Sequence, residues 1–171
     1  APFEMRILAH DPYLLSGSEP KGVRMVSLEQ LLRESDYVSL HCPLTERTRH
    51  LLNDSTLQLM KRDAYLINLA RGPIIDQVAL ARLLAERRIA GAALDVFDPE
   101  PVKPDDPLLT LDNVLLSPHT AAVSVEGFLA ATLLDCEQML RAARGEVPDN
   151  IVNREVLKRA DFQAKLARFQ R

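Results

Sequence analysis

Tryptophan is absent from this 171-residue chain, and aromatic residues make up only 5% of it. Surfaces that bind sugars or stack nucleic-acid bases need aromatic side chains, so the composition argues against both. The 21 Lys and Arg residues nearly balance the 24 Asp and Glu residues, and this lack of excess positive charge argues against a nucleic-acid-binding surface. No apolar run approaches the roughly 20 residues that span a bilayer. We therefore expect neither a nucleic acid nor a membrane as a partner.

Cysteine is scarce too. Cys42 and Cys136 are too few and too far apart for a disulfide framework. The first six residues lack the basic-then-apolar order of a signal peptide, so we expect a cytoplasmic protein. The four histidines and two cysteines show no metal-ligand spacing such as CxxC or HxxxH, and the sequence therefore predicts no metal site.

Short apolar segments alternate with helical patterns along most of the chain. The segments typical of buried strands cover residues 5–9, 37–41, 64–68, 92–96 and 113–116. The apolar spacing predicts helices that open near Ser27, cover residues 54–60, run from Asp76 to near Gly91, and run from about Val123 to Arg144. Continuously apolar strands separated by helices are typical of a parallel sheet covered on both faces. We predict a partial α/β domain with a doubly wound, Rossmann-like parallel sheet, followed by a C-terminal helical segment.

Polar residues follow several of the predicted strands directly. Because open parallel sheets bind ligands at the carboxyl ends of their strands, these residues are candidates for a site. Arg71 follows the strand at 64–68, Glu100 the strand at 92–96, and His119 the strand at 113–116. Each alone is more typical of an exposed or structural residue, but three successive strand ends bring them within reach of one cleft. The set therefore points to catalysis.

These residues lie in motifs that resemble the NAD-dependent D-isomer-specific 2-hydroxyacid dehydrogenases. The family motifs H-x-P, N-x-A-R-G, D-V-F-x-x-E-P and P-H occur here in the family's order, beginning at His41, Asn68, Asp95 and Pro118. Each motif alone is weak, whereas the ordered set is specific, and the match runs from about Ile7 to Asn153. The resemblance implies NAD as the cofactor, a small 2-hydroxy or 2-keto acid as the substrate, and a homodimer.

The chemistry of that family explains the residue types. Reducing a 2-keto acid requires a cation for the carboxylate, a proton donor for the carbonyl oxygen, and a hydride. Arg71 supplies a planar, permanently charged group that grips carboxylate oxygens in pairs. Histidine exchanges protons near neutral pH, so His119 would be the acid and base. Glu100 would hydrogen-bond that imidazole and fix its tautomer, while the nicotinamide supplies the hydride.

The resemblance also implies a set of cofactor-binding residues. Asp11 would bind the adenosine ribose hydroxyls, and the resemblance favours this role over the alternative of a simple turn, in which an Asp-Pro pair is common. No Arg follows within the next few residues to receive a 2′-phosphate, which favours NAD over NADP. Asp95 would contact the nicotinamide carboxamide. The remaining implied cofactor contacts are His41, Cys42, Pro43, Thr48, Ala70, Arg71, His119 and Ala122.

One family motif is missing. The phosphate-binding loop G-x-G-x-x-G would lie about 20 residues before Asp11, where only ten residues precede it, and none of the six glycines are two apart. The simplest interpretation is the C-terminal half of a dehydrogenase. Residues 1–118 would then be a partial NAD-binding domain, 119–146 a long helix leading back toward the substrate domain, and 147–171 the tail of that domain. Alone, such a chain is expected to be unstable or to associate, and to bind NADH weakly.

Three functions are considered for a chain with these motifs. The first is an oxidoreductase that transfers a hydride between NAD(H) and a D-2-hydroxy or 2-keto acid. The second is a non-enzymatic, NAD-binding regulatory protein of the corepressor branch of the same family, which the three candidate residues do not exclude. The third, an S-adenosyl-ligand domain, accommodates Asp11 but leaves Arg71, Glu100 and His119 without a role.

Overall fold

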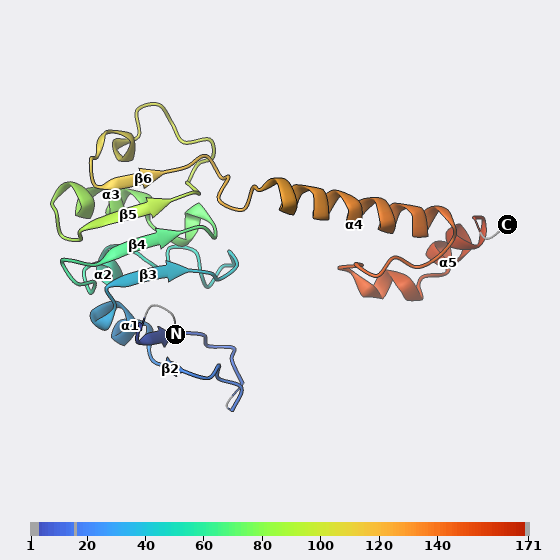
Figure 1. Cartoon of the computed structure of the whole chain (residues 1–171), viewed down its shortest axis with the longest axis horizontal. Coiled ribbons are helices and arrows are strands. Elements are labelled where there is room, and N and C mark those ends of the chain that lie inside the picture. The colour runs from blue at the N-terminus through green and yellow to red at the C-terminus, as the bar shows by residue number, and fades with distance from the viewer. Residues whose placement is uncertain (1–3, 16, 170–171) are drawn as a thin grey trace. The chain divides into compact units, whose positions relative to one another are not determined.

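The computed structural model describes residues 4–15 and 17–169, which form two compact units that divide between Ala121 and Ala122. The described strands of the first unit pair only in parallel (Figure 1). They are β1 (Ile7–Ala9), β2 (Val23–Met25), β3 (Tyr37–Leu40), β4 (Tyr65–Asn68), β5 (Gly91–Leu94) and β6 (Val114–Leu116). This arrangement confirms the predicted α/β, Rossmann-like fold.

The described strands belong to two separate sheets. β1 pairs with β2, while β3, β4, β5 and β6 form a four-stranded sheet in that order. β1 and β3 therefore each pair on one side only, and unpaired strand edges are templates for association. That the chain alone associates and binds NADH weakly stays a prediction.

Helices connect the strands of the first unit. They are α1 (Leu28–Glu34), α2 (Asp54–Leu57) and α3 (Gln77–Ala85). Asn53 caps α2, and Asp76 caps α3 by accepting a 3.0 Å hydrogen bond from the Ala79 amide. The helices predicted over 54–60 and from Asp76 to near Gly91 are present, but their predicted ends were wrong, because α2 ends at Leu57, α3 ends at Ala85 and Gly91 starts β5. β2 was missed because three residues, one of them Arg24, carry no readable periodicity.

The core lies on one face of the four-stranded sheet. Val38, Leu66 and Ala92 stand side by side in register on β3, β4 and β5, and all three are buried. Leu80 and Leu84 of α3 are buried in the same cluster. Alternation along each strand sends the next residues to the other face, where Tyr37 and Tyr65 stack with ring centroids 5.7 Å apart.

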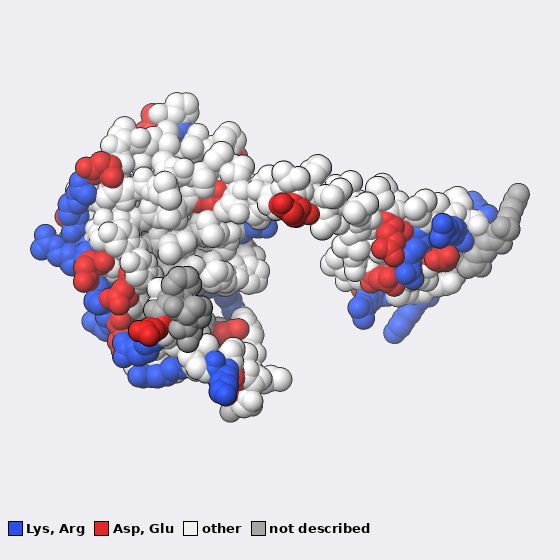
Figure 2. All heavy atoms as spheres, viewed as in Figure 1, with Lys and Arg blue, Asp and Glu red and all other residues white. Residues whose placement is uncertain are grey.

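Ion pairs surround the end of the sheet at which the strands begin. Asp36, just before β3, pairs with Lys61, and Arg87, before β5, pairs with Asp112, before β6. Figure 2 shows charges of both signs crowded along this side of the first unit.

The second unit contains α4 (Val125–Ala143), the short 3-10 helix η3 (Arg154–Lys158) and α5 (Ala160–Ala167). Ser124 caps α4 by accepting a hydrogen bond from the Gly127 amide, and the helix predicted over 123–144 is confirmed to within two residues. No residue of α4 is buried. Along the described part of the chain, no helix is long and apolar enough to cross a membrane. The predicted division of the C-terminal part at residue 146 stays a prediction.

Candidate active site

The structure joins Glu100 and His119, which follow the neighbouring strands β5 and β6. Nδ1 of His119 lies 3.1 Å from Oε2 of Glu100, and the other carboxylate oxygen accepts a 2.8 Å hydrogen bond from the Phe97 amide. The backbone hydrogen bond from Phe97 and the contact with His119 hold the pKa of Glu100 below its usual value. Partial burial of the carboxylate acts in the opposite direction, but its effect is smaller than that of the Phe97 hydrogen bond. Glu100 is thus an ionised partner for the imidazole.

Arg71 lies on the loop after β4, and a buried asparagine shapes that loop. Asn68 is only 1% exposed; its Oδ1 accepts a hydrogen bond from the Ala70 amide, and its Nδ2 donates one to the Arg71 carbonyl, both 3.0 Å. The exposed Arg71 guanidinium donates to the Ala70 carbonyl, and its charge also lowers the pKa of Glu100. Asn68 was not among the predicted site residues, although its place as the last residue of a strand before A-R-G was a usable signal.

A close backbone contact ties the Arg71 loop to the Glu100 loop. A Cβ on Gly72 would lie 1.8 Å from the Phe97 carbonyl oxygen, so only glycine fits between them. Phe97 is the same residue whose amide holds Glu100. The loops that carry two of the three candidate residues therefore pack directly against each other.

Asp95 is buried at the end of β5 and holds the loop that carries His119. Its Oδ1 accepts hydrogen bonds from the Ser117 hydroxyl (2.6 Å) and the Thr120 amide (2.8 Å), and its Oδ2 accepts one from the Ala121 amide (3.0 Å). Burial alone would raise the pKa of Asp95, but these bonds lower it below the usual value. Inside this loop His119 has a φ of 55°, in the left-handed region. The nicotinamide contact expected of Asp95 stays a prediction, and Ser117 was missed.

The loop after β3 carries four of the implied cofactor contacts, which are His41, Cys42, Pro43 and Thr48. The Thr48 hydroxyl donates a 2.7 Å hydrogen bond to the Pro43 carbonyl, which closes the loop on itself. His41 Nε2 lies 2.9 Å from the Ser39 hydroxyl. Within the described residues His41 forms no ion pair with a carboxylate like the one between His119 and Glu100. Cys42 packs against the core, and burial raises the pKa of its thiol, which opposes a nucleophilic role.

Three further predicted cofactor contacts, Asp11, Ala70 and Ala122, lie in surroundings that differ from one another. Asp11 follows β1 and accepts a 2.9 Å hydrogen bond from the Tyr13 amide, so it forms the turn that was the alternative to ribose binding. Its other oxygen takes no hydrogen bond within the described residues. Ala70 is half-buried against the core. Ala122 is exposed and opens the second unit, whose position relative to the site is not determined.

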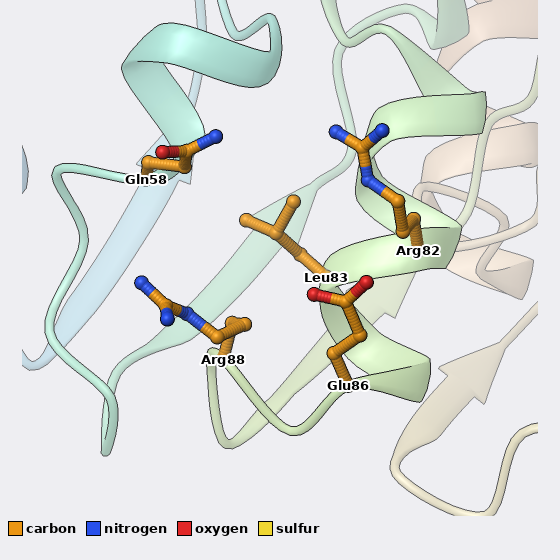
Figure 3. A pocket seen from close by; sticks show the side chains of 5 residues that line it. All are labelled: Gln58, Arg82, Leu83, Glu86 and Arg88. Carbon is orange, nitrogen blue, oxygen red and sulfur yellow. The ribbon is translucent and has the colours of Figure 1, made fainter.

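A shallow hollow of about 340 Å³ lies elsewhere in the first unit (Figure 3). Gln58 follows α2, Arg82 and Leu83 belong to α3, and Glu86 and Arg88 precede β5. None of the predicted site residues lines it. Among the described residues, no group of three or more His, Cys, Asp or Glu side chains is placed to hold a metal ion.

The chain matches known dehydrogenases in sequence. Residues 1–121 match the family described as D-isomer specific 2-hydroxyacid dehydrogenase, NAD binding domain. The chain is 50% identical over 157 residues to a glyoxylate reductase of Korarchaeum cryptofilum, covering 91% of this chain and 47% of that protein. It is 44% identical over 153 residues to a D-3-phosphoglycerate dehydrogenase of Methanocaldococcus jannaschii, covering 88% of this chain and 29% of that one. The chain thus spans half or less of the length of these relatives.

Solved structures agree. The TT0316 protein of Thermus thermophilus superposes with a TM-score of 0.82 at 39% identity, over 88% of this chain and 47% of that one. The NAD-complexed D-isomer specific 2-hydroxyacid dehydrogenase of Lactobacillus delbrueckii ssp. bulgaricus gives 0.77 at 31% identity, over 86% and 49%. The chain belongs to the D-isomer-specific 2-hydroxyacid dehydrogenase family. The predictions of that family and of NAD as its cofactor are confirmed, and the predicted bounds of the NAD-binding domain stay a prediction.

The described residues fit part of NAD. Asp11 has a carboxylate oxygen available for ribose hydroxyls, and the exposed Arg71 and His119 follow parallel strands at the end of the sheet where dinucleotides bind. A pyrophosphate is normally held by the backbone amides of a glycine-rich loop at a helix N-terminus, and these 171 residues contain no G-x-G-x-x-G. The residues expected to contact the ribose and the nicotinamide are thus present in the described part of the chain, and those contacts stay predictions.

Proposed function

We propose that this chain contributes the acid-base half of an active site that interconverts a D-2-hydroxy acid and the corresponding 2-keto acid with NAD(H). The observation that carries the proposal is the 3.1 Å contact between His119 and Glu100, next to the loop of Arg71. The family membership supports it. Because the chain spans about half the length of its glyoxylate reductase relatives, the activity of the whole protein belongs to this proposal.

Each residue has one task in the reduction. Arg71 binds the substrate carboxylate through paired N–H groups and orients the carbonyl. Protonated His119 donates the proton from Nε2 to the carbonyl oxygen, which becomes the hydroxyl. Glu100 accepts the hydrogen bond from Nδ1, so the ring keeps Nε2 directed at the substrate and its positive charge is stabilised. The hydride for the carbonyl carbon would come from the nicotinamide of NADH when it is bound. In the oxidation direction, neutral His119 takes the hydroxyl proton back.

The test is turnover by the full-length protein. NADH consumption is measured with glyoxylate, with pyruvate and with a keto acid of larger side chain, because the first of these is the substrate named for several relatives. Loss of NADH absorbance with at least one 2-keto acid supports the proposal. NADH binding without turnover of any of them overturns it and favours the regulatory alternative of the same family.

Assembly is part of the same proposal. α4 exposes Val125, Phe128 and Leu133, each more than half accessible, and such a row of apolar side chains suits an interface. We propose a homodimer, tested by light scattering on the full-length protein, and a single-chain mass overturns it. The cytoplasmic location and the lack of nucleic-acid or membrane partners stay predictions.

A further inference from the structure

Gln77, the first residue of α3, bridges two points of the loop that carries Glu100. Its Oε1 accepts a 2.9 Å hydrogen bond from the Asp98 amide, and its Nε2 donates a 2.7 Å hydrogen bond to Oδ2 of Asp106. A backbone N–H only donates and a carboxylate only accepts, so the two partners fix the orientation of the amide. Neither an acid nor an amine in this place satisfies both partners.

This loop is rich in proline, so side-chain hydrogen bonds contribute to holding its shape. It contains Pro99, Pro101, Pro104 and Pro107, which lack the N–H that would tie them to neighbouring backbone. Each residue of the Gln77–Asp106 hydrogen bond is held by a further contact. Gln77 starts a helix whose cap, Asp76, holds the Ala79 amide, and Asp106 also accepts a hydrogen bond from the amide of the fully buried Leu108.

The bridge lies two residues from Glu100 along the chain. Fixing the Asp98 amide also fixes the preceding peptide, and the Phe97 amide then donates to Glu100 at 2.8 Å. The second oxygen of Glu100 is thereby directed at His119. The charged groups near this turn are His119 and Arg71, which face Glu100, and Arg49, whose guanidinium lies 3.9 Å from the Asp98 carboxylate.

We propose that Gln77 is a positioning residue that holds the segment 97–100 in the conformation in which Glu100 supports His119. The proposal rests on the proposed function of Glu100 and His119. Gln77 touches neither of them and does not take part in the proton transfer. Its effect is to keep the carboxylate in place, so its loss changes kcat more than KM.

The test uses two single variants of the full-length protein and one double variant in which the acid and the amide change places. Gln77→Ala removes both hydrogen bonds. Gln77→Glu keeps an acceptor for the Asp98 amide but sets a second carboxylate against Asp106. In the double variant Gln77→Glu/Asp106→Asn, the side chain at position 106 donates through its NH₂ group to the carboxylate at position 77, which restores the bridge. The asparagine oxygen still accepts from the Leu108 amide. Gln58→Ala is the matched control, because Gln58 donates to Asp54 on the surface, away from the site.

We expect Gln77→Ala and Gln77→Glu to lower kcat by about tenfold with little change in KM, which corresponds to the loss of about one hydrogen bond's free energy. The double variant recovers most of the rate, and Gln58→Ala leaves it unchanged. Carbon NMR of the Glu100 carboxyl group shows its pKa moving up toward the usual value in Gln77→Ala and returning in the double variant.

The readouts separate the possible results. If the melting temperature falls in Gln77→Ala while kcat and the Glu100 titration stay as in the parent, Gln77 is merely structural and the proposal is wrong. If Gln77→Ala does not fold, the double variant decides, because failure to recover the rate contradicts the bridge. A parent protein that reduces no 2-keto acid refutes the proposed function, and the Glu100 titration still tests the positioning role.

Discussion

Nδ1 of His119 is 3.1 Å from Oε2 of Glu100, although 19 residues separate them in the sequence. The contact arises because β5 and β6 are adjacent and parallel, so the loops after them emerge at the same edge of the sheet. With Nδ1 taken by Glu100, only Nε2 of the ring remains for a substrate. The pair therefore defines both the tautomer of the histidine and the atom that transfers the proton.

Replacing Glu100 with glutamine tests this relationship. The amide oxygen of Glu100→Gln still accepts from the Phe97 amide, but the negative charge beside the imidazole is gone. We expect kcat in the full-length protein to fall by about 10²-fold, because His119 loses the partner that stabilises its protonated form. Steady-state kinetics with a 2-keto acid and NADH measure the effect. A variant with parental kcat removes Glu100 from the mechanism.

Arg71→Lys tests whether substrate binding needs only the positive charge of Arg71 or also the planar shape of its guanidinium group. Lysine keeps the positive charge but cannot bind a carboxylate through two parallel N–H groups. We expect kcat/KM for the keto acid to fall by at least about tenfold, the scale of one charge-assisted hydrogen bond. Arg88→Lys, in the hollow of Figure 3, is the matched control and is expected to leave kcat/KM unchanged. Equal losses in both variants contradict a specific role for Arg71.

Asp95→Asn tests the anchor of the His119 loop. One carboxylate oxygen becomes an NH₂ group that faces N–H or O–H donors in a buried site, so we expect the variant to lose about 1–3 kcal/mol of unfolding free energy at neutral pH. The pKa of Asp95 is lowered in the folded protein, so its stabilisation is fully present above the usual aspartate pKa and disappears as the pH falls through the lowered value. Denaturant unfolding across acidic pH should show the two proteins converging. A constant difference contradicts the assignment.

Gly72→Ala tests the contact between the Arg71 and Glu100 loops. The new Cβ meets the Phe97 carbonyl oxygen at 1.8 Å, so the loops must move apart. We expect a loss of about 1–3 kcal/mol in unfolding free energy, typical of overpacking, together with a lower kcat. Gly127→Ala, within α4, places its Cβ 3.1 Å from the Ser124 hydroxyl and at ordinary contact distance, 3.8 Å, from the Ala122 carbonyl oxygen, and is expected to change stability by less than about 1 kcal/mol. Parental stability of Gly72→Ala refutes the close approach.

The sequence predicted the parts of the fold that depend on strong local patterns. The apolar strands after Asp36 and the long helix over 123–144 are each legible in a window of a few residues, and the ordered motifs pointed to Glu100 and His119 together. Asn68, Ser117 and Gln77 were missed because their roles depend on partner groups that the fold brings to them, from two residues away for Asn68 to 29 for Gln77. The three-residue strand β2 is defined by its pairing with β1 and not by its own composition.

The central claim is that His119 exchanges the proton with the substrate, and His119→Gln in the full-length protein tests it most directly. Glutamine is similar in size and keeps hydrogen-bonding groups, but it does not act as an acid near neutral pH. The account predicts that kcat for reduction of the 2-keto acid falls by at least about 10²-fold, while the Kd for NADH, measured by calorimetry, stays close to that of the parent. A His119→Gln protein that turns over substrate at the parental rate would contradict the account.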